Sequence, residues 1–189
     1  MAIEPSGELS ALAAALLWTL SSGLWRSVSD QASAVQLNSI KNSLGTLFFL
    51  PVLIRIPWRE HPGAIAALLI SGVVGIALGD SLYLAALRRI GTRRTLTIEA
   101  AGPVLASIGS LLIQGESLTV LDFTGAALVA WSVLLIANRA TSASSELVFD
   151  RDGVLLALGS VVSGLTGAFL ARAVLLEGQF SALDSAAIR

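Results

Sequence analysis

Long apolar stretches alternate with short polar connectors along this chain. A helix that crosses the hydrocarbon core of a bilayer needs about 20 predominantly apolar residues. The apolar stretches therefore predict membrane-spanning helices, and the short connectors predict that consecutive helices are antiparallel neighbours. The predicted spans are Leu9–Trp25, Gln36–Ile54, Ala64–Leu87, Thr95–Ile113, Leu118–Ala137 and Val154–Leu176.

The pattern predicts an all-α fold, a polytopic transmembrane helix bundle. The period-two alternation that marks the strands of a membrane β-barrel is absent from the sequence. Only one connector, residues 140–152, is long and polar enough to be a linker between two units. We therefore expect a first unit over residues 1–139 and a second that begins at residue 153.

Composition supports a membrane protein and removes several other classes. Hydrophobic residues make up 54% of the chain and charged residues 13%, and the mean hydropathy is +0.80. The net charge of −1 gives no basic surface for nucleic acid, and the chain has no cysteine. His61 stands alone beside Pro62 in a connector, so no metal-ligand set is visible. We predict no enzyme activity, no catalytic residues and no cofactor, and an integral location in the cell membrane.

The start of the sixth predicted span repeats the start of the first. GELSALAAALLWTLSSGLWRSV (residues 7–28) aligns without gaps on GVLLALGSVVSGLTGAFLARAV (residues 153–174). After an insertion of two residues, SAVQLNSIK (33–41) falls on SALDSAAIR (181–189). An arginine closes both first helices in the same register, and a cation ends both second segments. The pattern predicts that residues 153–189 begin a second copy of the first unit.

Five helices in the first copy would make the second copy enter the bilayer from the opposite side. Such inverted repeats build transporters that work by alternating access. We expect a complete protein of about ten helices and roughly 290–300 residues, judged from the repeat spacing. The missing helices would come from the rest of the second copy or from a second chain in a homodimer.

Residues 77–136 carry a resemblance to a known family. The features are a glycine-rich third helix that ends in YLAAL, a proline in the fourth helix, and Gly-Glu twelve and thirteen residues later. The positions are Tyr83–Leu87, Pro103, Gly115–Glu116 and the fifth helix Leu118–Ile136. The segment resembles helices three to five of EamA-type transporters of the drug/metabolite transporter superfamily. The resemblance implies two inverted five-helix repeats around a central cavity lined mainly by helices one, three, four and six.

Asp80 is the one charged residue between Gly63 and Leu87. A carboxylate near the middle of a span costs about 2.5–3.5 kcal/mol on insertion scales, so it is expected to face protein or water. Tyr83, three residues later, shares its helix face. We predict that both contact substrate. The alternative for Asp80 is a structural bridge to Lys41 or to an arginine of RRIGTRR.

Glu99 is the second acidic residue of this kind, in the predicted fourth helix. Pro103 removes the hydrogen bond to the Glu99 carbonyl and predicts a kink at Gly102 and Pro103. Family members often carry Glu at the position of Gly102, whereas here Glu99 lies one turn earlier. A break beside an acid is a candidate site for a polar ligand. The alternative is a solvated acid in the first turn of its helix.

Further substrate-binding candidates lie on the first two helices. Trp18 and Ser22 share a face, and Trp18 lies deep enough to stack on a ligand. Asn38 and Lys41 form a polar patch in the second helix, for which the alternative is a lysine that extends to the lipid headgroups.

The favoured function is secondary transport or export of a small metabolite between lipid-embedded helices, with protons as the candidate coupling ion. The alternatives are a non-transporting membrane scaffold or an intramembrane enzyme. Arginines crowd the connectors on one side of the membrane, which places the N-terminus outside, whereas the family resemblance implies both ends in the cytoplasm.

Overall fold

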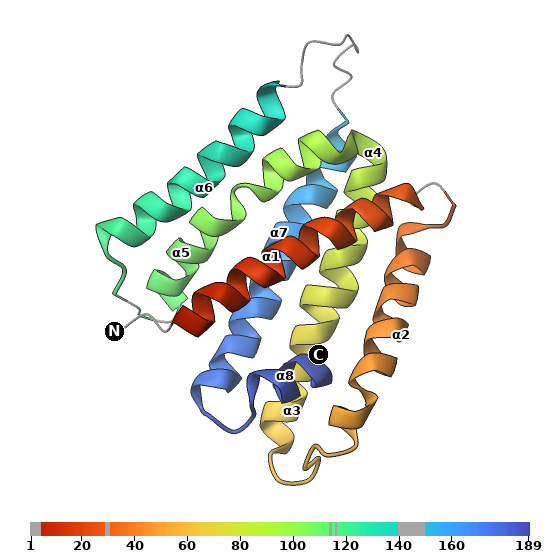
Figure 1. Cartoon of the computed structure of the whole chain (residues 1–189), viewed down its shortest axis with the longest axis vertical. Coiled ribbons are helices and arrows are strands. Elements are labelled where there is room, and N and C mark those ends of the chain that lie inside the picture. Colours follow the sequence, from red (N-terminus) through yellow and green to blue (C-terminus); the bar gives the residue numbers. More distant parts are fainter. Residues whose placement is uncertain (1–4, 29–30, 114, 116, 140–149) are drawn as a thin grey trace.

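A computed structural model describes residues 5–28, 31–113, 115, 117–139 and 150–189. Every regular element within these ranges is helical (Figure 1), which confirms the predicted all-α class. The elements are α1 (Pro5–Ser27), α2 (Ala34–Leu53), α3 (Pro62–Gly72), the π-helix η1 (Val73–Leu78), α4 (Gly79–Glu99), α5 (Gly102–Ile113), α6 (Val120–Arg139), α7 (Arg151–Leu176) and α8 (Ala182–Ile188).

The predicted third span lies in a long helical rod made of α3, η1 and α4. Pro62 starts this rod at the first helical position, where its missing N–H is not needed. Within the described ranges, Pro62–Glu99 and Arg151–Leu176 are long and apolar enough to cross a bilayer. Shorter apolar helices cover Leu9–Trp25, Gly102–Ile113 and Val120–Leu135.

The start predicted for the fourth span, Thr95, is wrong. Helical geometry resumes directly after Gly91, whose φ of 75° and ψ of 165° break the helix, and Figure 1 shows the chain turning back here before α5. A positive φ is strained for residues other than glycine. The predicted connector RRIGTRR is therefore a sharp turn around a single residue. A second break falls between Glu99 and Gly102, directly before Pro103.

The long helix α7 packs along the whole rod. At one end, the aliphatic cluster of Ala86, Ile90 and Ala157 joins α4 to α7. Arg89 reinforces this end, because its guanidinium lies 3.5 Å from a carboxylate oxygen of Asp150 and 3.1 Å from one of Asp152. Helix α7 thus begins at Arg151, inside the predicted 140–152 linker; residues 140–149 of that linker lie outside the described ranges.

The opposite end of α7 is held by a second cluster that includes α8. Its buried members are Ile56, Ile65, Leu68, Ala171, Val174, Phe180 and Ile188. Large apolar side chains outside these clusters stay exposed on the bundle surface, Phe48 at 80% and Leu121 at 79% among them. Exposed side chains of this kind suit contact with lipid tails.

Between the two clusters, the rod and α7 touch through small residues. A Cβ on Gly167 would lie 2.6 Å from the Cα of Gly75 and 2.8 Å from the carbonyl oxygen of Ser71. The hydroxyl of Ser71 donates a hydrogen bond of 2.7 Å to the Gly167 carbonyl. Close backbone approach between small residues is the usual way in which membrane helices associate. This crossing fixes the middle of the rod, where Asp80 is located.

Candidate functional site

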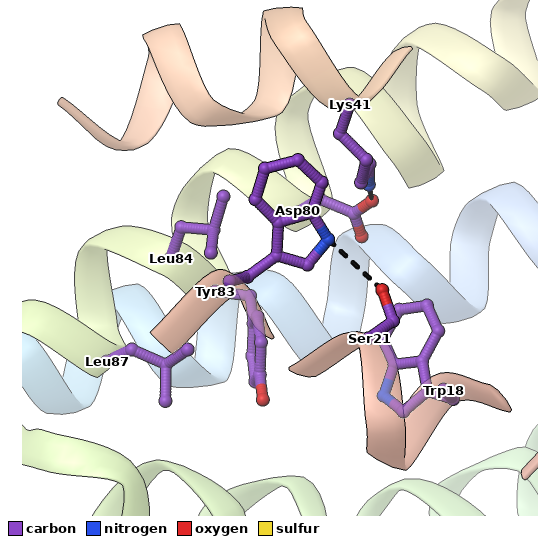
Figure 2. A pocket seen from close by; sticks show the side chains of 8 residues that line it. Trp18, Ser21, Lys41, Asp80, Tyr83, Leu84 and Leu87 are labelled. Carbon is purple, nitrogen blue, oxygen red and sulfur yellow. Dashed lines mark hydrogen bonds and ion pairs between the residues drawn. The ribbon is translucent and has the colours of Figure 1, made fainter. Parts of the chain in front are cut away.

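A hollow of about 410 Å³ lies between α1, α2 and α4. Its volume is within the range of small-molecule sites, which are mostly apolar with a few polar groups. Figure 2 shows the side chains that surround it. The lining residues are Trp18, Ser21 and Trp25 from α1, Lys41 from α2, and Asp80, Tyr83, Leu84 and Leu87 from α4.

The charged wall of the hollow is an ion pair between Lys41 and Asp80. The ammonium of Lys41 donates to Oδ2 of Asp80, and the two side chains meet at one end of the hollow in Figure 2. Their side chains are 28% and 21% exposed, so both remain within reach of a ligand. The pair offers one cation and one anion to whatever enters.

The π-helix η1 directly precedes Asp80 and is fastened by Asn38. The Asn38 side chain is 2% exposed, and its Nδ2 lies 3.0 Å from the carbonyl oxygen of Ile76 and 2.9 Å from that of Ala77. The same nitrogen is 3.0 Å from Oγ of Ser81. Wide turns of this kind disturb the regular pattern of backbone hydrogen bonds and occur often at functional sites. Asn38 therefore acts as a clamp that positions the residues beside the ion pair.

A second cation approaches Asp80 from α8. The Arg189 Nη2 would be 3.4 Å from a Cβ on Gly75, and its guanidinium is close enough to the Asp80 carboxylate for the charges to attract. Its Nε is buried and donates no hydrogen bond to any residue that the structure describes. In the predicted repeat, Arg189 is the counterpart of Lys41.

Glu99 belongs to a different contact. The hydroxyl of Ser160, a buried residue of α7, donates a hydrogen bond to Oε1 of Glu99. Glu99 ends α4, so its alternative as a first-turn acid is wrong. Its carboxylate interacts electrostatically with Asp80, but it does not line the hollow.

The structure brings together four of the predicted residues, Trp18, Lys41, Asp80 and Tyr83. Asn38 lies behind them, whereas Glu99 faces α7. The predicted Ser22 has a side chain that lies outside the described part of the chain. Gly102 and Pro103 begin α5, after the helix break, and are not part of the hollow.

Sequence reasoning missed Ser21 and Arg189 as site residues. Ser21 lies three residues after Trp18 and four before Trp25, on the same helix face, and it accepts a hydrogen bond of 3.1 Å from Trp25 Nε1. This spacing could have identified it. For Arg189, the repeat register that pairs it with Lys41 was the available signal.

Comparisons with known proteins agree with this architecture. Residues 5–138 match the model of the EamA-like transporter family. A protein described as an uncharacterized transporter, from Archaeoglobus fulgidus, is 28% identical over 134 residues, which are 68% of this chain and 47% of the relative. The chain thus spans about half the length of the curated relative that it matches. No solved structure matches the chain. The match over most of the chain shows that it belongs to the EamA-like transporter family.

Proposed function

We propose that this protein is a multi-pass transporter of the cell membrane that moves a small metabolite through the hollow between α1, α2 and α4. The observation that carries the proposal is the Lys41–Asp80 pair, which is placed on apolar helices and lines a hollow of ligand size. Ionisable groups inside membrane helices usually mark the path of a substrate or ion. Family membership points in the same direction, to transport and not to catalysis.

Alternating access is the mechanism that the predicted repeat supports. Two similar connectors precede α2 and α8: Ser33 forms a capping box with Gln36, and Ser181 forms one with Asp184. Both caps share the same extended backbone, with φ near −68° and ψ near 160° on the printed values of −67°, 158° and −69°, 164°. Further helices, from the rest of the second repeat or from a second copy, would complete the cavity.

Protons are the proposed coupling ion, with Asp80 and Glu99 as carriers. Each carboxylate has a partner that protonation would weaken, Lys41 for Asp80 and Ser160 for Glu99. Loss of the Asp80 charge would release Lys41, and loss of the Glu99 charge would loosen α4 from α7. Transport would then accelerate under an inward proton gradient.

The test is uptake into liposomes that contain the purified protein. Radiolabelled amino acids, nucleobases, monosaccharides and organic acids serve as probes, with protein-free liposomes as the blank. We expect saturable uptake of at least one class, a loss of more than tenfold in Asp80→Asn, and no change in the connector variant Arg59→Gln. Absence of saturable uptake of every class would contradict transport. Unchanged uptake in both Asp80→Asn and Glu99→Gln would contradict the assignment of the site.

A further inference from the structure

The polar groups around the hollow are not balanced between donors and acceptors, and the imbalance bears on the charge of a ligand. We propose that the hollow binds an amphipathic organic anion, whose carboxylate or comparable acidic group is received by Lys41 and whose apolar body lies against Trp18 and Tyr83. Asp80 acts as the resident counter-ion that the ligand's anionic group displaces. This inference rests on the proposed function, because it names the substrate class of the same hollow.

The apolar body follows from the lining. Aromatic and leucine side chains provide most of the walls, from Trp18 and Trp25 on α1 and from Tyr83, Leu84 and Leu87 on α4. Rings of this kind favour flat or apolar ligands through stacking and burial of apolar surface. A small, fully hydrated solute would leave these walls without contacts.

The negative charge follows from two cations that share one carboxylate. Lys41 is paired with Asp80, and Arg189 reaches toward the same carboxylate with a buried Nε that donates to no described residue. The other acid nearby, Glu99, is bonded to Ser160 of α7 and does not line the hollow. A ligand anion would supply the acceptor that these cations share only incompletely.

The same region offers few acceptors to a cation. The carbonyl oxygens of η1 would be its natural ligands, because a wide turn releases them from regular bonding. Asn38 already donates to the carbonyls of Ile76 and Ala77, and the hydroxyl of Ser81 lies 2.6 Å from the latter. Only Asp80 would be left to receive a cation, in competition with Lys41.

The experiment measures binding of three ligands that share one aromatic body. The protein is placed in nanodiscs of phosphatidylcholine and titrated at pH 7 with 3-phenylpropionate, 3-phenylpropylamine and 3-phenylpropanamide in a calorimeter. We expect the anion to bind at least tenfold more tightly than the neutral amide, and the amine to bind more weakly than the amide. Tightest binding of the amine, equal binding of anion and amide, or binding of none of the three would overturn the inference.

Variants of the ion pair give a prediction with two signs. Lys41→Met should abolish the preference for the anion and Lys41→Arg should keep it, whereas Asp80→Asn should strengthen anion binding severalfold because it removes the competing carboxylate. A cation site requires the reverse for Asp80→Asn. Arg55→Gln, in the exposed connector after α2, is the charge-matched control and should bind like the parent protein. The ranking of the three ligands by the parent protein decides the matter even where a variant does not fold.

Failure here and failure of transport can be told apart. Saturable uptake of a cationic or neutral metabolite would contradict the anion inference and leave the transporter standing. Binding of 3-phenylpropionate without uptake of any probe class would do the opposite.

Discussion

Helices α1 and α7 are aligned copies in the predicted repeat, yet they meet the bundle in different ways. The α1 residues that line the hollow are Trp18, Ser21 and Trp25, and the register places Gly164, Gly167 and Ala171 at the same positions of α7. Those small residues are where α7 lies against the rod, as the contacts of Gly164 with Gly79 and of Gly167 with Gly75 show. Side-chain size at three matched positions therefore decides whether a copy closes on its neighbour or leaves space for a ligand.

The second helices of the two copies differ much less. Ser33 and Ser181 cap α2 and α8 in the same way, and each helix carries a cation, Lys41 or Arg189, toward Asp80. The functional divergence of the copies is thus concentrated in the first helix of each.

The strongest test of this comparison is the same substitution in both first helices. Gly167→Ala should destabilise the protein by about 3 kcal/mol, because the new Cβ would meet the backbone of the rod and overpacking of this kind cannot relax easily. Gly23→Ala on α1 meets nothing within 4 Å and should be neutral or slightly stabilising. Equilibrium unfolding by dodecyl sulfate in mixed micelles measures both. Equal loss in the two variants would refute the close contact.

Removal of the cations should separate α2 from α8. Lys41→Met should lower the free energy of unfolding by about 2 kcal/mol, since it leaves a partly buried carboxylate without its direct partner. Arg189→Met should have a smaller effect, because Arg189 interacts with Asp80 without a direct ion pair. The double variant Lys41→Met/Asp80→Asn should recover part of the loss in a double-mutant cycle; full additivity would show that the pair contributes nothing.

The clamp on η1 has no described counterpart on α8, where Ser185 and Ala186 follow the aligned Leu183 and Asp184. Asn38→Leu should cost about 1–2 kcal/mol, because it leaves carbonyls of the π-helix without a donor. Asn42→Leu, one turn further along α2, serves as the matched control. Hydrogen exchange of the amides of residues 73–81 should accelerate in Asn38→Leu alone, and unchanged exchange would argue against the clamp.

The two caps should give the smallest effects and equal ones. Ser33→Ala and Ser181→Ala each remove the acceptor for a backbone N–H, and each should cost about 0.5–1 kcal/mol. Unfolding in mixed micelles checks the pair side by side. A clear difference between them would weaken the structural case for a repeat at this connector.

Hydropathy alone predicted the all-α class and the position of most helices, because apolar length dominates the free energy of a chain in lipid. It did not predict the join between the third and fourth spans. There the four arginines of RRIGTRR suggested a connector, but Gly91 reverses the chain without leaving helical geometry for more than one residue. Polar side chains at a membrane surface are compatible with a helix, so polarity does not mark its end.

The site was predicted in part. A lone acid in an apolar run identified Asp80, and helical spacing added Tyr83. The partner of Asp80 stayed open between Lys41 and the arginines, because a choice between them requires the packing of α2 against α4. The role of Asn38 could not be foreseen either, since the π-helix that it fastens leaves no mark in the hydrophobic pattern of Val73–Leu78.

That widened turn also sets the direction of everything that follows it in the rod. A regular helix advances about 100° per residue, and the widened turn accommodates one residue more than a regular turn. Deleting a single residue within Val73–Leu78 would therefore swivel Asp80 and Tyr83 by more than a quarter of a revolution, away from α2 and toward other neighbours. The aim of the binding wall depends on one surplus amino acid, so insertions and deletions in this short stretch should be far more damaging than most substitutions.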